Sequence, residues 1–75
     1  MQELIEFMVK SIVDNKDVVS VDVQKDDRVT TYNVLVAQND IGGVIGKSGK
    51  IAQAIRTIAK SASGRGHVRI KFDAK

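Results

Sequence analysis

Four glycines, two lysines and a serine are gathered in residues 40–50, which read Asp-Ile-Gly-Gly-Val-Ile-Gly-Lys-Ser-Gly-Lys. Glycine has no Cβ, so a ligand can come close to the backbone there. A helix that begins directly after this stretch would present unpaired N–H groups and a partial positive charge. Together with the ammonium groups of Lys47 and Lys50, these features are typical of a phosphate-binding segment. The phosphate could belong to a nucleotide or to the backbone of a nucleic acid.

A nucleotide-binding P-loop is the first alternative, and the spacing argues against it. That motif requires a glycine, four further residues, and then Gly-Lys followed by Ser or Thr. Gly46, Lys47 and Ser48 match its end, but Ile41 occupies the position of the first glycine, and Gly42 lies one residue too close. We also expect 75 residues to be too few for the larger sheet and the acidic strand that such a site needs.

Other catalytic chemistry has little support in the sequence. The absence of cysteine excludes a cysteine nucleophile, a disulfide and a cysteine zinc site. The single histidine, His67, falls at the outward start of an expected strand, and Ser48 has no base placed beside it. Asp26 and Asp27 fall in an expected turn, where carboxylates are usually solvated. We therefore expect no enzyme, no cofactor, no metal ion and no small-molecule substrate.

Positive charge is concentrated in the half of the chain that contains the glycines. Residues 1–40 carry four basic side chains against eight acidic ones, and residues 41–75 carry eight basic side chains against Asp73 alone. The first half therefore has a net charge of −4 and the second a net charge of +7, although the whole chain has only +3. Such asymmetry indicates a polyanionic partner.

The length of the chain predicts one domain over residues 1–75. A chain of this size buries only about 60% of its unfolded surface, so pairing with a second chain is a common means of stabilisation. No apolar run approaches the roughly 18 residues of a membrane span, and the N-terminus lacks the pattern of a secretory signal. We expect a cytoplasmic protein without membrane contact.

The hydrophobic pattern of the first half predicts a helix and a hairpin. Apolar side chains at helical spacing indicate a helix over residues 3–14, and strict alternation indicates a strand over residues 18–24. A turn at residues 25–28 leads to a second strand with Tyr32, Val34 and Val36 on one face. Because the turn is short, the two strands are expected to pair antiparallel.

The second half predicts two helices and a strand. Asp40 is expected to cap a short helical turn that ends at Ile45, and a longer helix is expected over residues 50–63. Gly64-Arg65-Gly66 would end this helix, with Gly64 in the left-handed conformation. A strand over residues 67–72 alternates between apolar and polar side chains. The central seam of the long helix is predicted to consist of Ile51, Ile55, Ile58 and Ala62.

These elements predict an α+β fold in the order α-β-β-α-α-β. The crossover from the second to the third strand passes through two helices, so those strands are expected to run parallel. Each strand has one mainly apolar face, so the three helices must cover a single face of a three-stranded mixed sheet.

A helix, the loop Gly46-Lys47-Ser48-Gly49 and a second helix beside a small sheet resemble a KH domain. In KH domains, a GxxG loop clamps the backbone of about four nucleotides of single-stranded RNA. The order with a helix first and the single strand last is similar to the type II arrangement. Over nearly its whole length the chain resembles the KhpA family of short bacterial KH proteins, through residues 40–49 and the run Ala54-Ile55-Arg56-Thr57.

The resemblance to KhpA implies several properties that the residues alone do not. It implies binding of single-stranded RNA, formation of a homodimer, and partnership with a larger KH protein, KhpB. It also implies a role as an RNA chaperone or post-transcriptional regulator in cell-shape and envelope homeostasis.

On this reading, the N–H groups around Lys47 and Ser48 and the start of the helix at Lys50 hold successive phosphates. The bases would lie on an aliphatic groove, and the three aromatic residues are expected in the core, so binding should be weak, salt-sensitive and poorly sequence-specific. The expected core aromatics are Phe7, Tyr32 and Phe72. The groove residues are Ile41, Val44, Ile45 and Ala54, and the whole RNA-binding set adds Gly42, Gly43, Gly46, Lys47, Ser48, Gly49 and Lys50.

The alternative hypothesis is a pairing module whose partner supplies the contact with RNA. The long helix is apolar over nearly half its circumference, more than a small sheet can cover. One edge of it, including Ile58, is a candidate dimer interface. In a dimer, Arg65, Arg69 and Lys71 would extend the basic surface, and two weak sites would gain avidity.

Overall fold

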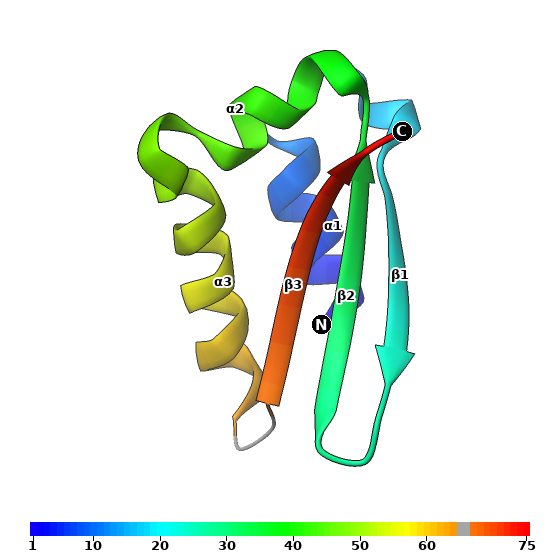
Figure 1. Cartoon of the computed structure of the whole chain (residues 1–75), viewed down its shortest axis with the longest axis vertical. Helices are drawn as coiled ribbons and strands as arrows, with labels where there is room; N and C mark the ends of the chain where they lie inside the picture. Colours follow the sequence, from blue (N-terminus) through cyan, green and yellow to red (C-terminus); the bar gives the residue numbers. More distant parts are fainter. Residues whose placement is uncertain (65–66) are drawn as a thin grey trace.

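The computed structural model describes residues 1–64 and 67–75 (Figure 1). Of the residues expected to end the long helix, Arg65 and Gly66 lie outside the described part, so the expected role of Arg65 in a basic surface also lies outside it. The order of helices and strands confirms the prediction. The elements are α1 (Gln2–Lys10), β1 (Ser20–Lys25), β2 (Val29–Val36), α2 (Ile41–Ile45), α3 (Lys50–Ser63) and β3 (His67–Ala74), with 3-10 turns at Lys16–Val18, Gln38–Asp40 and Lys47–Gly49.

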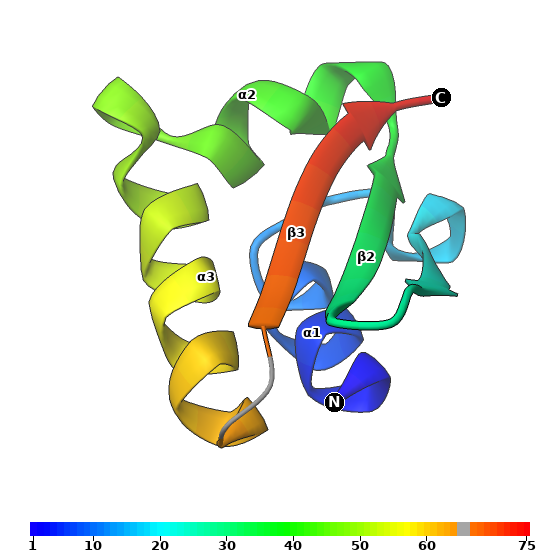
Figure 2. The ribbon, with the colours of Figure 1, turned by 60° about the horizontal axis from the view of Figure 1, so that its bottom comes forward.

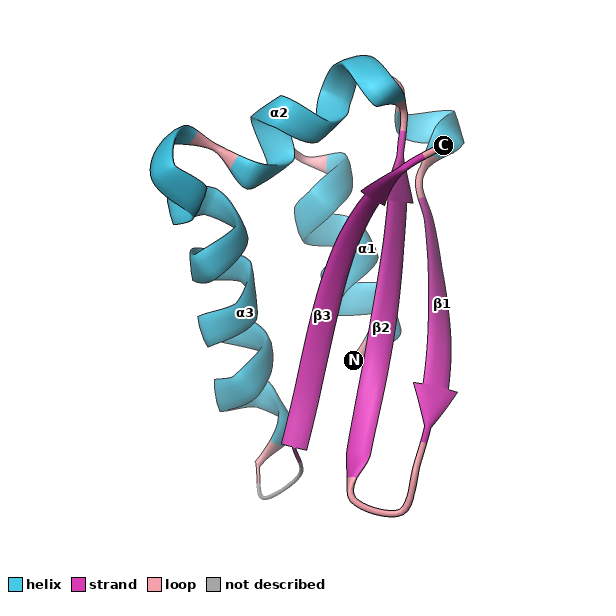
Figure 3. Cartoon of the chain, viewed as in Figure 1, coloured by secondary structure: helices cyan, strands magenta, loops and turns pink. Residues whose placement is uncertain are grey.

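The three strands form one mixed sheet in the order β1-β2-β3 (Figure 3). β1 pairs antiparallel with β2, with Val21 opposite Val34, and β2 pairs parallel with β3, with Tyr32 opposite Ile70. All three helices pack on the same face of the sheet (Figure 2). This arrangement confirms the expected type II KH fold, in which β3 forms the sheet edge beside α3.

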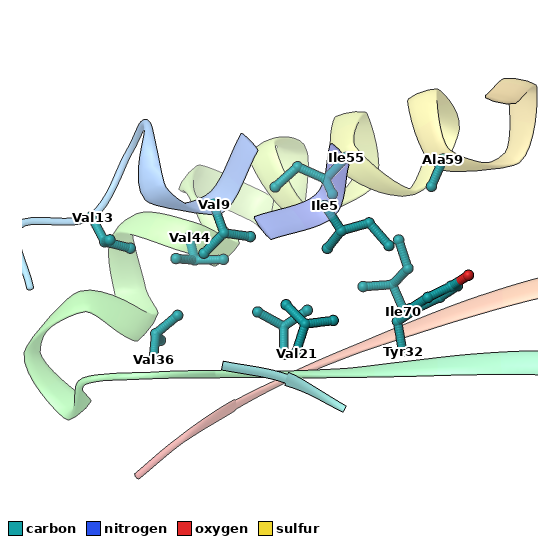
Figure 4. Close-up of a cluster of buried hydrophobic side chains, with 11 residues drawn as sticks. Ile5, Val9, Val13, Val21, Tyr32, Val36, Val44, Ile55, Ala59 and Ile70 are labelled. Atoms are coloured by element: carbon teal, nitrogen blue, oxygen red, sulfur yellow. The ribbon is translucent and has the colours of Figure 1, made fainter. Parts of the chain in front are cut away.

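The core lies between this face of the sheet and the helices (Figure 4). Ile5 and Val9 of α1 and Val34 and Val36 of β2 are fully buried. Each such side chain contributes roughly 1.5–3 kcal/mol by leaving water. The remaining members of the core cluster are Val13, Val21, Tyr32, Val44, Ile55, Ala59 and Ile70.

Helix α1 ends at Lys10, four residues before the predicted end. The hydroxyl of Ser11 donates to the carbonyl of Phe7 at 2.8 Å, and the chain then turns so that Val13 enters the core. The N–H groups of Asp14 and Asn15, which a longer helix would pair internally, donate instead to the carboxylate of Asp40. A distant residue therefore sets the position at which this helix stops.

Two predictions of core membership are wrong. Phe7 is 70% exposed, because Ile5 and Val9 turn the opposite side of α1 toward the sheet. In α3, the buried seam is Ala52, Ile55 and Ala59, while Ile51 and Ile58 are 38% and 48% exposed. Small alanines let this helix approach the sheet closely, so the buried seam is turned by roughly 60° around the helix axis from the predicted one, with Ile55 in both.

The end of α3 partly matches the expectation for Gly64. Its φ is +73°, a positive value as predicted, but its ψ of −119° lies outside the left-handed helical region. Among the described residues, no helix is both long and apolar enough to cross a membrane.

Candidate nucleic-acid interface

The loop Gly46–Gly49 forms the corner of the molecule where α2 meets α3 (Figures 1 and 2). Gly46 has a φ of +74° and a ψ of 180°, and a Cβ built on it would lie 2.7 Å from Cγ1 of Ile51. Gly49 has a φ of +75° and precedes the first residue of α3. Both positions of the GxxG motif therefore have a positive φ that favours glycine, and Gly46 also has a close contact that excludes a Cβ.

The two residues between these glycines present unpaired donors. The N–H groups of Lys47 and Ser48 have no backbone acceptor among the described residues, whereas that of Gly49 donates to the carbonyl of Gly46 at 3.3 Å. The side chains of Lys47, Ser48 and Lys50 are exposed, and no acidic residue lies in the first turn of α3. The described part of the chain holds one ion pair, Glu6 with Lys10, so the lysines of the loop remain available to an anion.

Neither backbone conformation nor packing requires glycine at Gly42 and Gly43. Both lie in α2 and are exposed, and a Cβ built on either would meet no atom within 4 Å. In a helix, glycine is less favourable than alanine by up to about 1 kcal/mol, and the fold offers nothing in return here. The two glycines therefore leave the backbone of α2 open at the surface.

The four expected groove residues differ in exposure. Ile45 is 41% exposed and Ala54 is exposed, whereas Ile41 is half-buried and packs against the core. Val44 has no exposed surface, so it packs α2 onto the core and cannot touch a base directly. Ile51, which the sequence pattern assigned to the buried seam, instead lies over Gly46 and adds apolar surface beside the loop.

A shallow basic hollow lies between α3 and the free edge of β3. Its volume is about 290 Å³, and it adds Arg56 and Lys60 to the two basic residues of β3 that were expected to face outward. Arg56 and Lys60 are one helical turn apart on the helix that begins at the loop, and this spacing was a signal that sequence reasoning did not use. The hollow is lined by Arg56, Lys60, Val68, Arg69, Ile70 and Lys71.

Asp40 holds the beginning of α2 in place. It was expected to cap this helix with its side chain, but no such hydrogen bond forms. Its carboxylate is almost buried and accepts from the N–H of Asn15 at 3.0 Å, the N–H of Asp14 at 3.2 Å and the side-chain amide of Asn15 at 3.0 Å. These bonds, led by the one from the Asn15 backbone, keep the pKa of Asp40 below its ordinary value. Through them, the α1–β1 connection fixes the helix that carries Gly42 and Gly43.

Comparison with known proteins identifies close relatives over most of the chain. Residues 2–74 match the model of the KhpA/KhpB KH-domain family. The RNA-binding protein KhpA of Borreliella burgdorferi is 39% identical over 71 residues, covering 95% of this chain and 87% of the relative. KhpA of Listeria monocytogenes is 37% identical over 73 residues, covering 97% and 96%. KhpA of Caldanaerobacter subterraneus is 44% identical over 63 residues, covering 84% of each chain.

Proposed function

Because this chain belongs to the KhpA/KhpB KH-domain family, we propose that it binds single-stranded RNA through the loop Gly46–Gly49. The curated relatives carry the name RNA-binding protein, and the chain is a binding protein rather than an enzyme. The observation that carries the proposal is the loop itself, where the unpaired N–H groups of Lys47 and Ser48 lie beside exposed ammonium groups.

Binding begins with the phosphates of the RNA backbone. One phosphate accepts from the N–H groups of Lys47 and Ser48, and the next lies near the first turn of α3, where the helix dipole favours an anion. Lys47 and Lys50 add full positive charge. Because this contact displaces counterions and reads no base, the affinity falls as the salt concentration rises.

The bases then lie along the surface between α2, α3 and the edge of β3. The open backbone at Gly42 and Gly43 allows a ribose or base to approach, and Ile45, Ile51 and Ala54 offer apolar contact. Tyr32 is buried, Phe72 is half-buried against the core with the guanidinium of Arg56 over its ring, and Phe7 lies on α1, outside this surface. We therefore assign little of the binding free energy to stacking of bases on aromatic rings.

Filling the two helical glycines tests this proposal without changing any charge. The double variant Gly42→Ala/Gly43→Ala should fold with the same or greater stability, by up to about 1 kcal/mol for each site, because alanine favours the helix and meets no atom. The same methyl groups occupy the surface that the RNA approaches, so we expect a loss of affinity of roughly tenfold, the equivalent of about 1.4 kcal/mol. Urea unfolding and fluorescence anisotropy with a short single-stranded RNA measure the two effects.

The control for this variant is Ser61→Ala, which raises helix propensity at an exposed position near the far end of α3. It should leave the affinity for RNA as it is. If the glycine variant binds RNA as tightly as the wild type, the surface of α2 is not part of the RNA site.

A second candidate function, pairing, is supported by the exposed apolar stripe on α3. Ile51, Ala54 and Ile58 recur at helical spacing outside the buried seam. We propose that the lower part of this stripe, around Ile58, joins two copies of the chain or contacts a KhpB-like partner. From the family resemblance, we further propose one KH domain over residues 1–75, acting in the cytoplasm as an RNA chaperone or post-transcriptional regulator in cell-shape and envelope homeostasis.

The substitution Ile58→Asp tests the pairing. Because Ile58 is 48% exposed and the seam of Ile55 and Ala59 is untouched, the variant should stay folded. A buried, unpaired carboxylate at an interface costs several kcal/mol, so the dimer should dissociate to monomers in sedimentation experiments. Gln53→Asp introduces the same charge at an exposed position about 140° around α3 from Ile58, and should leave the dimer intact. A folded Ile58→Asp dimer would remove this residue from the interface.

RNA binding and pairing are separable by one further observation. If the loop clamps the RNA, a loop variant loses RNA while its sedimentation stays that of the wild type. If pairing is the main function, the loop variant and the wild type behave alike, and Ile58→Asp alone changes the protein.

A further inference from the structure

Arg56 lies at the edge of β3 between the basic hollow and a second hollow that Phe72 and Asp73 also line, and two contacts hold it there while leaving most of its donors free. Its Nε–H donates to the carbonyl of Ile70 at 3.2 Å, and its guanidinium carbon lies 5.3 Å from the centre of the Phe72 ring. Among the described residues, its two Nη groups have neither a hydrogen-bond acceptor nor a carboxylate partner. The guanidinium is therefore fixed in orientation, with one face covered by an aromatic ring and its outer edge unoccupied.

This position lies on the path that the RNA strand takes in the proposed function. Arg56 follows the first residue of α3 by six positions, which is ~9 Å along the helix axis. It lines the hollow between α3 and the edge of β3, together with the apolar side chains of Val68 and Ile70. A nucleotide whose phosphate is held at the loop would direct its base toward this hollow, so the outer edge of Arg56 is placed to meet a base rather than a phosphate.

An oriented guanidinium recognises two hydrogen-bond acceptors that lie side by side. Guanine presents such a pair at O6 and N7, and cytosine presents one at N3 and O2. Adenine and uracil alternate donors and acceptors along the edges that an unpaired base exposes. An oriented guanidinium can therefore form two parallel hydrogen bonds with guanine or cytosine, but not with adenine or uracil.

We propose that Arg56 is a specificity-determining residue, which makes the site prefer RNA with a guanine or a cytosine at the position over the α3–β3 hollow. This inference rests on the proposed function, because it concerns the same RNA site. The inference extends the proposed function, because it adds selection of a base to a loop that contacts only the RNA backbone. The contacts with Ile70 and Phe72 favour this role, since a side chain that is already ordered loses less entropy when it binds.

The test uses uridine hexamers in which one central position is A, C, G or U, each with a fluorescent label. We expect wild-type protein to bind the G or the C hexamer at least about fivefold more tightly than the A and U hexamers, as one bidentate contact allows. The two favourable arms separately show whether guanine or cytosine is the better base. Equal binding of all four hexamers would overturn the inference.

The informative variant is Arg56→Lys, which keeps the positive charge but cannot form two parallel hydrogen bonds. It should lower the ratio between favoured and disfavoured hexamers to about one, which a general loss of affinity would not do. The matched control is Lys60→Gln, which removes a neighbouring charge of the same hollow. It should weaken the binding of all four hexamers by a similar factor and preserve the ratio. A preserved ratio in Arg56→Lys would assign base selection to another residue and overturn the inference.

The aspartate variant of the loop, Lys47→Asp/Ser48→Asp, separates this inference from the function on which it rests. If that variant binds all four hexamers as the wild type does, the proposed clamp fails. If it loses binding while Arg56→Lys keeps the wild-type ratio, the clamp stands and only the role of Arg56 fails.

Discussion

Replacement of Lys47 and Ser48 together by aspartate is expected to reduce the affinity for single-stranded RNA at least about thirtyfold at low salt, the equivalent of roughly 2 kcal/mol. The variant changes the charge of the loop by three units, because it removes one positive charge and adds two negative ones. Two carboxylates then face the phosphates that the free N–H groups of the loop would otherwise bind. Each phosphate contact that is lost should also reduce the slope of log affinity against log salt by about 0.7.

The structure gives a specific reason why this variant should fold. Both side chains are exposed and contact no part of the core. Ser48 has a φ of +59° and a ψ of 24°, the left-handed region in which aspartate is one of the better-tolerated residues. Gly46 and Gly49, which the loop conformation requires, are unchanged. Thermal unfolding should therefore stay within a few degrees of the wild type, for a change of ~0.5 kcal/mol.

A charge-matched control distinguishes the loop from the net charge of the protein. Lys25→Ser with Arg28→Asp changes the charge by the same three units at the hairpin turn, at the other end of the molecule from the loop (Figure 1). This control should keep most of the wild-type affinity, measured by fluorescence anisotropy at two salt concentrations. If both double variants lose RNA to the same degree, the interaction depends on overall charge and the loop is not a clamp.

The sequence was sufficient to predict the fold because its local and long-range signals agree. The valines of β1 and β2 alternate with polar residues, so the face that each strand turns to the core could be read directly. The bounds of α3 were also correct, since a glycine precedes the helix and another follows it. The GxxG loop was also recognisable, because its glycines occupy positions where other residues would be strained.

The errors arose where distant residues decide the outcome. The end of α1 depends on Asp40, which takes the N–H groups that the helix would have used. The seam of α3 could not be chosen from its pattern, because apolar residues cover nearly half of that helix and only packing on the sheet selects among them. The contacts of Arg56 with Ile70 and Phe72, on which its proposed role rests, were not predictable either, because β3 meets α3 only after the chain has folded. Periodicity describes one element at a time and contains none of these contacts.

The second large effect concerns the first glycine of the loop, where Gly46→Ala should destabilise the fold by roughly 3 kcal/mol or more. With a φ of +74° and a ψ of 180°, Gly46 adopts a conformation that is almost restricted to glycine. The added Cβ would also lie 2.7 Å from Cγ1 and 2.9 Å from Cβ of Ile51, and the Cβ of Ile51 cannot move without its helix. The corner between α2 and α3 would have to open, so RNA binding should be lost together with stability. Urea unfolding and RNA titration measure both.

Gly49→Ala is the matched control, because it separates backbone strain from collision. Gly49 also has a positive φ, +75°, but a Cβ built on it meets no atom within 4 Å. The substitution should therefore cost only the strain of a left-handed alanine, about 1–2 kcal/mol. A larger cost at Gly46 than at Gly49 means that Ile51 braces the loop from the first turn of α3. Equal costs would mean that the contact with Ile51 relaxes freely, and that the loop owes its shape to backbone preference alone.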